Sequence, residues 1–233
     1  MRILITGIGS IGSELLRQLE GQIYAFDIDE TRLFDLLEEC KLEGKDVIGK
    51  VGDIRDKDSL MSVFLEFQPK LVFHCAALKH VTPSMWTPRE YVKTNVLGTL
   101  NVLELAREFG TQKVINISTD KVVNAENIMG ATKKIAEIAT KIYGRTSVRF
   151  GNVMGSRGSL LMIWAKQFAE GKPLTITDER MERYFMSIPE AVNLVIEASR
   201  IGKGGEVMIL DMGKPKNIID LKNGSGNIEV MGN

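Results

Sequence analysis

Cysteine and histidine are scarce in this sequence. The 233 residues include only two cysteines, Cys40 and Cys75, and only two histidines, His74 and His80. Both cysteines lie in segments of apolar periodicity, as buried thiols do in a reducing compartment, so no disulfide framework is expected. Neither histidine has cysteine or carboxylate neighbours at ligand spacing, and no metal site is predicted.

An excess of one sign of charge and long hydrophobic runs are also missing. Lysine plus arginine total 30 and aspartate plus glutamate total 30, so the charge balance favours neither nucleic acid nor an anionic membrane as partner. No apolar run reaches the length that spans a bilayer, and the opening MRILITG leads into a strand and turn rather than a leader peptide. These absences predict a cytoplasmic protein without membrane insertion whose partner is a small molecule.

Apolar runs of strand length alternate with longer segments of helical periodicity. The expected strands cover residues 2–6, 22–26, 47–51, 71–74, 114–118 and 147–150. The expected helices cover residues 14–19, 31–42, 59–67, 92–109 and 133–142. Near-continuous apolar strands joined by helices predict the α/β class, with a Rossmann-type doubly wound parallel sheet covered on both faces.

Shorter elements are expected after Gly151. They are a helix over 160–170, a strand over 174–177, a short strand near Phe185, a helix beginning at Pro189 and a strand over 206–210, followed by a turn-rich segment at 223–227. Residues 1–150 are therefore predicted to form the Rossmann domain with the catalytic residues. Residues 151–233 are predicted to form a small, abbreviated C-terminal substrate-binding cap, intertwined with that core.

A glycine motif follows the first expected strand. Gly7-Ile8-Gly9-Ser10-Ile11-Gly12 has the spacing G-x-G-x-x-G and opens the first expected helix. Glycines at these positions let the backbone turn tightly and approach a pyrophosphate at the helix N-terminus. The motif and its context predict a dinucleotide-binding site that includes Gly7, Gly9, Ser10, Ile11 and Gly12.

Acidic residues at the ends of the second and third strands extend this site. Asp27 would accept hydrogen bonds from the adenosine ribose hydroxyls and would repel a 2′-phosphate, which favours NAD; Arg32 keeps NADP as the alternative. Asp53 and Ile54 are placed to meet the adenine. An equally good interpretation is that Asp53 is an N-cap or turn residue of the helix that follows.

A hydroxyl, an acid and an amine follow the fifth expected strand, in Ser118-Thr119-Asp120-Lys121. Open α/β sheets bind ligands at the C-terminal edge of their strands, so the cluster is a candidate catalytic site. The alternative is that Asp120 and Lys121 form a solvated turn, as most exposed pairs of this kind do.

Four stretches carry a specific family resemblance. They are FHCAALKHVTPSMWTPREYVKTNVLGTLNV, INISTDKVVNAENIMGATKKIAE, VRFGNVMGSRGS and TITDERMERYFMSIPEAV. With the glycine loop they cover most of the chain to about Gly213. The chain resembles UDP-N-acetylglucosamine 4,6-dehydratases of the polysaccharide-biosynthesis type, within the extended short-chain dehydrogenase/reductase superfamily.

The resemblance implies roles for individual residues. Ala76, Ala77 and Lys79 would lie along the cofactor and near the sugar. Thr119 would be the active-site hydroxyl, and Lys133 would hold the nicotinamide ribose.

Met129 stands where most of the superfamily has the tyrosine of Tyr-x-x-x-Lys, with Lys133 as the lysine. A thioether cannot act as an acid or a base. Taken alone, this substitution would indicate an inactive protein with Met129 as an ordinary apolar helix residue. The resembled subgroup, however, includes members with methionine here.

Two departures from the family pattern stand out. The glycine loop is one residue shorter than the T-G-x-x-G-x-x-G usual in the superfamily. The segment after Asp211 is abbreviated, and relatives continue there into an arginine-containing segment that helps to hold the nucleotide diphosphate.

The resemblance implies a reaction that starts with C4 oxidation of a UDP-sugar. Lys121, if neutral, would remove the C5 proton, and Asp120, if protonated, would protonate the departing C6 hydroxyl. We expect Thr119, with a water held by Lys133, to accept the C4 hydroxyl proton.

Polar residues in the last third of the chain are candidates for holding the sugar nucleotide. Asn152 and Arg157 follow the sixth strand, and Arg183 offers a bidentate contact to the diphosphate. The alternative interpretation is that each of the three is a loop or surface residue.

The interpretation favoured by these observations is a nucleotide-sugar 4,6-dehydratase acting on UDP-N-acetylglucosamine or a related UDP-sugar in surface glycan synthesis. The alternatives are a UDP-sugar 4-epimerase of the same superfamily and a non-catalytic dinucleotide-binding regulator. Apolar residues in excess of one core-facing stripe on the helical segments 92–109 and 128–143 predict a homo-oligomer formed through a helix pair.

Overall fold

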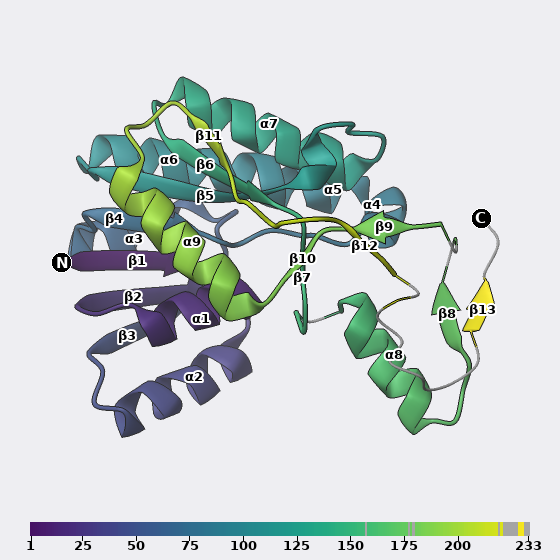
Figure 1. The fold of residues 1–233 in the computed structure, drawn as a ribbon. Coiled ribbons are helices and arrows are strands. Elements are labelled where there is room, and N and C mark those ends of the chain that lie inside the picture. Colours follow the sequence, from purple (N-terminus) through teal and green to yellow (C-terminus); the bar gives the residue numbers. More distant parts are fainter. Residues whose placement is uncertain (157, 177, 179, 219, 221–227, 231–233) are drawn as a thin grey trace.

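A seven-stranded parallel sheet forms the centre of the computed structural model, which describes residues 1–156, 158–176, 178, 180–218, 220 and 228–230 (Figure 1). The strand order is β11-β6-β5-β4-β1-β2-β3. The strands are β1 (Arg2–Thr6), β2 (Gln22–Asp27), β3 (Val47–Val51), β4 (Leu71–His74), β5 (Lys113–Thr119), β6 (Thr146–Phe150) and β11 (Val207–Ile209). The prediction of a doubly wound, Rossmann-type parallel sheet is confirmed.

Helices cover both faces of the sheet (Figure 1). One face carries α1 (Ser10–Gln18), α2 (Glu30–Leu42) and α9 (Ile188–Ile201), and the other carries α3 (Lys57–Phe67), α6 (Thr99–Glu108) and α7 (Ile128–Ile142). Alternate residues of each strand point to opposite faces, so Ile3 and Ile5 enter one core and Leu4 enters the other. This is why the buried strands are apolar along their whole length.

Side-chain caps define several helix starts. The Asp29 and Asp56 carboxylates accept backbone N–H groups at the starts of α2 and α3, and Asn127 caps α7 through Gly130. Ser187 and Glu190 form a reciprocal capping box at the start of α9.

The helix expected over 92–109 is in fact two elements. A π-helix, η1 (Val92–Gly98), precedes α6. Asn95 lies in this wider turn, and its side chain contacts Leu78. The side-chain amide donates to the Leu78 carbonyl at 2.9 Å, and the side-chain carbonyl accepts the Leu78 N–H at 2.8 Å. Periodicity alone does not show a π-helix, which often occurs at functional sites.

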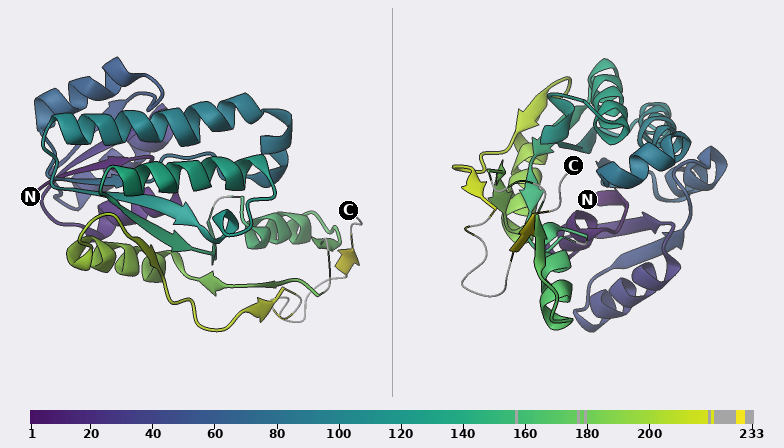
Figure 2. Two further views of the ribbon diagram at one scale, coloured as in Figure 1. Left: turned by 90° about the horizontal axis from the view of Figure 1, so that it is seen from above. Right: turned by 90° about the vertical axis from the view of Figure 1, so that its right-hand side faces the viewer.

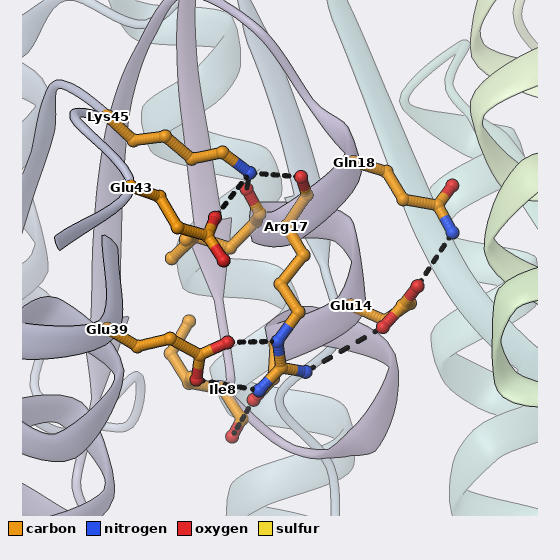
Figure 3. A network of polar contacts seen from close by, with 9 residues as sticks. Ile8, Glu14, Arg17, Gln18, Glu39, Glu43 and Lys45 are labelled. Atoms are coloured by element: carbon orange, nitrogen blue, oxygen red, sulfur yellow. Dashed lines mark hydrogen bonds and ion pairs between the residues drawn. The ribbon is translucent and has the colours of Figure 1, made fainter. Parts of the chain in front are cut away.

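A polar network joins α1 to α2 behind the glycine loop (Figure 3). The Arg17 guanidinium donates to both carboxylate oxygens of Glu39, at 2.6 and 3.0 Å, and the Lys45 ammonium donates to the carbonyls of Leu16 and Arg17 at the end of α1. Because the side chains of Arg17 and Glu39 are about 40% exposed, the pair adds little stability and mainly orients α1.

The last third of the chain lies partly beyond the carboxyl ends of the sheet strands (Figure 2). That part contains α8 (Leu160–Ala169), β7 (Asn152–Val153) paired with β10 (Phe185–Met186), β8 (Leu174–Ile176) paired with β13 (Ile228–Val230), and β9 (Glu182–Arg183) paired with β12 (Lys216–Asn217). Trp164, Leu174, Ile176 and Ile218 form its own small core. Helix α9 and strand β11 return to the main sheet, so the two parts of the chain are intertwined.

The pairings of β9, β12 and β13 were not expected from the sequence, and the turn expected at 223–227 lies outside the described residues. Short elements complete the fold near the sheet edge: α4 (Val81–Trp86), α5 (Pro88–Tyr91) and the 3-10 helix η2 (Asp120–Val122). Within the described residues no helix combines the length and apolarity needed to cross a membrane. Cys40 and Cys75 are both free.

Candidate functional site

A cavity of about 610 Å³ lies at the carboxyl ends of the central strands. Its walls come from the glycine loop after β1, the segment after β4, the end of β5, helix α7 and the loop after β6. The order in which successive strands are added to the sheet reverses between β1 and β4, which is where open α/β folds bind ligands. The volume is that of a small-molecule site.

Two of the three glycines in the glycine loop have no room for a side chain. Gly7 has a φ of +86°, and a Cβ there would lie 2.3 Å from the backbone nitrogen of Ala76. A Cβ on Gly12 would lie 2.0 Å from the Gly7 carbonyl oxygen, whereas one on Gly9 would meet nothing within 4 Å. Gly9, Ser10, Ile11 and Gly12 line the cavity, so the open side of the loop faces the space for a ligand.

Asp27 is buried at the end of β2 and holds the glycine loop directly. One carboxylate oxygen accepts the N–H of Ile8 and the other accepts the N–H of Asp29 at 2.8 Å. Arg32 lines the cavity, donates to the Ile8 carbonyl at 3.2 Å and lies 3.4 Å from the Asp29 carboxylate. The sequence predicted a ribose contact for Asp27 but not this loop-shaping role.

Asp53 and Ile54 do not line the cavity. The Asp53 carboxylate accepts the backbone N–H and the guanidinium of Arg55, which keep its pKa below the usual range although burial opposes them. Ile54 is buried and packs against Gly98. Asp53 lies in a turn that precedes α3, and the N-cap of α3 is Asp56. A contact of Asp53 or Ile54 with adenine stays a prediction.

The segment after β4 forms one wall. Ala77 and Lys79 line the cavity, and Ala76 packs behind the wall against Gly7 and the core. Burial lowers the pKa of the Lys79 ammonium, and the nearby charges of Arg32 and Lys121 lower it further.

The residues at the end of β5 form a hydrogen-bonded cluster. The Thr119 hydroxyl donates to the Asp120 carboxylate at 2.9 Å, and the Lys121 ammonium donates to the same oxygen at 2.9 Å. Lys121 also donates to the Asn152 side-chain carbonyl at 3.2 Å. Thr119, Lys121 and Asn152 line the cavity. Asp120 is hydrogen-bonded to two of them but is not a lining residue, and 36% of its side chain is exposed.

Met129 and Lys133 reach the cavity from the first two turns of α7. Met129 is 2% exposed, and Lys133 is buried with its ammonium donating to the Ile117 carbonyl at 2.5 Å. Burial lowers the pKa of Lys133 to about 8.

Arg183 lies on β9 outside the cavity walls, where its guanidinium donates to the Glu182 carbonyl at 2.8 Å. Arg157 lies outside the described residues. Their predicted roles in binding a diphosphate stay predictions.

Glu137 is a neighbour of the site that was not expected from the sequence, whereas Ser118 belongs to the predicted cluster and His80 was expected at the rim of the site. His80 lines the cavity and packs on Gly158, where a Cβ would lie 2.6 Å from its ring. Ser118 also lines the cavity and bonds to a buried acid, Glu137, four residues after Lys133. That helical spacing is the one sequence signal that pointed to Glu137. Across the described part of the chain, no three His, Cys, Asp or Glu side chains gather in a way that could hold a metal ion.

The sheet order, glycine loop and edge cavity define a Rossmann-type protein of the short-chain dehydrogenase/reductase kind. More narrowly, the chain belongs to the polysaccharide biosynthesis protein family, whose model matches residues 3–231.

Relatives of the chain include a capsular polysaccharide biosynthesis protein, a dehydratase and an epimerase. The chain is 42% identical over 94% of its length to the capsular polysaccharide biosynthesis protein CapD of Staphylococcus aureus, and covers 39% of that protein. It is 36% identical over 89% of its length to a UDP-N-acetylglucosamine 4,6-dehydratase (inverting) of Campylobacter jejuni, covering 66% of it. It also matches a UDP-glucose 4-epimerase of Rickettsia canadensis, with 34% identity over 89% of this chain and 65% of that protein. The chain thus spans about two fifths of CapD.

Solved structures share the fold. The X-ray structure of Pen from Bacillus thuringiensis superposes with a TM-score of 0.91 at 35% identity, over 99% of this chain and 76% of that one. A dTDP-glucose 4,6-dehydratase of Streptomyces venezuelae, solved with NAD, has a TM-score of 0.87 at 19% identity, over 100% of this chain and 84% of that one. The second likeness is one of fold.

Proposed function

We propose that this protein is an NAD-dependent 4,6-dehydratase of UDP-N-acetylglucosamine or a related UDP-sugar, acting in surface polysaccharide synthesis. The observation that carries the proposal is the Thr119–Asp120–Lys121 cluster. It joins a hydroxyl, an acid and an amine by hydrogen bonds at the same cavity as the glycine loop. The family and the dehydratase relative support it.

The cavity fits a dinucleotide. The glycine loop leaves an open face at the start of α1, where backbone N–H groups and the helix dipole favour a pyrophosphate, and Asp27 anchors the loop beside it. Ala77 and Lys133 would border the nicotinamide half. When bound, NAD would supply the redox chemistry by taking hydride from C4 of the sugar and returning it at C6.

Lys121 and Asp120 would carry out the elimination. Lys121 takes the C5 proton, which a C4 ketone makes acidic, and Asp120 gives a proton to the C6 hydroxyl so that water leaves. Asp120 and Asn152 hold the amine from two sides, which restricts the direction in which it reaches the sugar. The side chains of both catalytic residues are about one third exposed, and a sugar in the cavity would cover them.

Thr119 would replace the missing tyrosine as the first acceptor of the C4 hydroxyl proton. The Thr119 hydroxyl already donates a hydrogen bond to Asp120. When Thr119 receives the proton of the C4 hydroxyl, it would pass its own hydroxyl proton to Asp120. Asp120 then holds the proton that the C6 hydroxyl needs as it leaves. Lys121 would return a proton to C5 when C6 receives hydride. The proton count then closes, because the water lost consists of the C4 hydroxyl proton and the C6 hydroxyl.

Thr119→Val is expected to slow C4 oxidation about a hundredfold, because the variant lacks the hydroxyl that receives the proton. Single-turnover absorbance of the reduced nicotinamide measures that step. Thr119→Ser keeps the hydroxyl and the cap on the Lys121 N–H, so it should retain most of the rate. Undiminished oxidation in the valine variant would remove Thr119 from this role.

Remaining site residues are proposed to bind the substrate. Lys79 and Asn152 line the cavity and would contact the sugar. Arg157 and Arg183, in the last third of the sequence, would bind the nucleotide diphosphate. We assign residues 1–150 to cofactor binding and catalysis and residues 151–233 to the substrate.

The direct test is to incubate the purified protein with UDP-N-acetylglucosamine and catalytic NAD, and to follow the sugar by mass spectrometry and proton NMR. Loss of one water with a new C6 methyl signal is the expected result. Unchanged sugar with bound NAD would overturn the assignment for this substrate.

A UDP-sugar 4-epimerase is the second candidate, favoured by relatives with that name. An epimerase needs no acid and base directed at C6 and C5, so the Asp120–Lys121 pair argues against it. In the same assay an epimerase would invert C4 without loss of mass. A non-catalytic regulator would bind the dinucleotide and leave every UDP-sugar unchanged.

We also propose self-association through α7 and η1. Ile135, Ile138 and Ile142 share one exposed side of α7, and Leu97 of η1 is 49% exposed. A dimer mass in sedimentation at micromolar concentration is expected, and a monomer mass there would contradict the proposal.

A further inference from the structure

A buried acid lies behind the cavity and has no part in the proposed proton transfers. The Glu137 side chain is 4% exposed. Its carboxylate accepts the Ser118 hydroxyl at 2.8 Å and the Arg149 guanidinium at 2.5 and 3.3 Å. Ser118 itself lines the cavity.

One carboxylate therefore joins three elements. Ser118 on β5 and Arg149 on β6 are direct neighbours in the sheet register, and Glu137 reaches both from α7. A buried carboxylate is tolerated when a charged partner and hydrogen bonds satisfy it, as they do here. Lys134, on the outer side of α7, lies 4.0 Å from the same carboxylate.

Lys133 is connected to this acid through helix geometry and charge. It precedes Glu137 by four residues, so both side chains leave the same face of α7. Burial lowers the pKa of Lys133 to about 8, while the negative charge of Glu137 on α7 acts in the opposite direction. The Cys75 thiol after β4 is neutral in this range, because burial raises its pKa to about 12. His74 at the end of β4 has a pKa lowered to about 3, first by burial and then by Lys133, so it is neutral beside the ammonium.

We propose that Glu137, held by Arg149, is a positioning residue for the cavity: it orients the Ser118 hydroxyl and keeps the Lys133 ammonium charged where a dinucleotide would meet it. The inference rests on the proposed function in one respect, that NAD occupies this cavity. A purely structural ion pair would stabilise the fold without acting on Lys133.

The test is Glu137→Gln, which keeps a hydrogen-bond acceptor and removes the charge. The titration of the Lys133 side-chain nitrogen, followed by NMR in ¹⁵N-lysine-labelled protein without ligand, should have its midpoint lowered by about one pH unit. At pH 8 the Kd for NAD should rise about fivefold, because the charged fraction of Lys133 falls from about one half to about one tenth. Glu137→Asp keeps the charge, so the midpoint of the Lys133 titration should return most of the way to the wild-type value.

Two further variants keep the result interpretable. Lys134→Gln alters the same helix beside Glu137. Lys134 is 42% exposed and is not a lining residue of the cavity, so this variant should change neither the Lys133 titration nor the Kd for NAD. If Glu137→Gln does not fold, Ser118→Ala keeps the Glu137–Arg149 pair and should still weaken NAD binding several-fold at an unchanged Tm.

If Glu137→Gln folds and the Lys133 titration is unchanged, the proposal is overturned. If only Ser118→Ala folds, unchanged NAD binding by that variant would overturn it. The titration needs neither cofactor nor substrate. A shifted midpoint in a protein that fails to dehydrate UDP-N-acetylglucosamine would count against the proposed function and leave the role of Glu137 standing.

Discussion

Lys121→Met should abolish dehydration, with a fall in rate of about a thousandfold, and leave dinucleotide binding intact. The side chain would keep its length and lose the amine that Asp120 and Asn152 hold at the cavity. C4 oxidation does not require that amine, so reduced nicotinamide should accumulate with the 4-keto sugar. Absorbance and mass spectrometry of a single turnover measure both.

Asp120→Asn is the matched variant, because it removes the acid and keeps the shape. C4 oxidation should slow, because Asp120 also takes the proton that Thr119 passes on. In the 4-keto sugar that does form, Lys121 could still take the C5 proton, so in deuterated water the sugar should gain deuterium at C5 without losing water. The lysine variant should show no such exchange. Equal exchange at C5 in the two variants would contradict the division of roles between base and acid.

Gly12→Ala should cost about 3 kcal/mol of unfolding free energy, because the new Cβ would lie 2.0 Å from the Gly7 carbonyl oxygen. Both groups belong to the backbone of a tight loop, so neither yields as a flexible side chain would. Chemical denaturation measures the loss, and NAD binding should fall with it.

Gly9→Ala is the control within the same loop. A Cβ there meets nothing within 4 Å, so the stability should stay within about 0.5 kcal/mol of the wild type. Gly9 faces the cavity, however, so NAD binding should weaken because the pyrophosphate can no longer approach the backbone. Equal unfolding midpoints for the two variants would show that the loop tolerates side chains at both positions.

The sheet and its helices were predictable because their signals are local. Continuous apolar strands such as 3–5 and 114–117 can be buried only in a sheet covered on both faces, and the structure places each near its expected bounds. The cap was less predictable. Strands of two or three residues, such as β9 and β12, depend on pairing with distant segments rather than on their own pattern.

The candidate site was predicted unevenly for a related reason. Residues in a motif directly after a strand, such as Gly9, Thr119 and Lys121, do line the cavity. Asp53 and Ile54 also follow a strand, yet β3 lies at the far edge of the sheet, and their side chains turn to Arg55 and the core.

The sequence by itself determined the fold class, the glycine loop and the order of chemical groups along the chain, since these depend on the character and spacing of neighbouring residues. Only the tertiary structure decided which groups meet. Lys121 reaches Asn152 because β5 and β6 are adjacent, and Glu137 contacts Ser118 and Arg149 because α7 packs over the same two strands. Contacts of this kind depend on sheet order and packing, which no local pattern encodes.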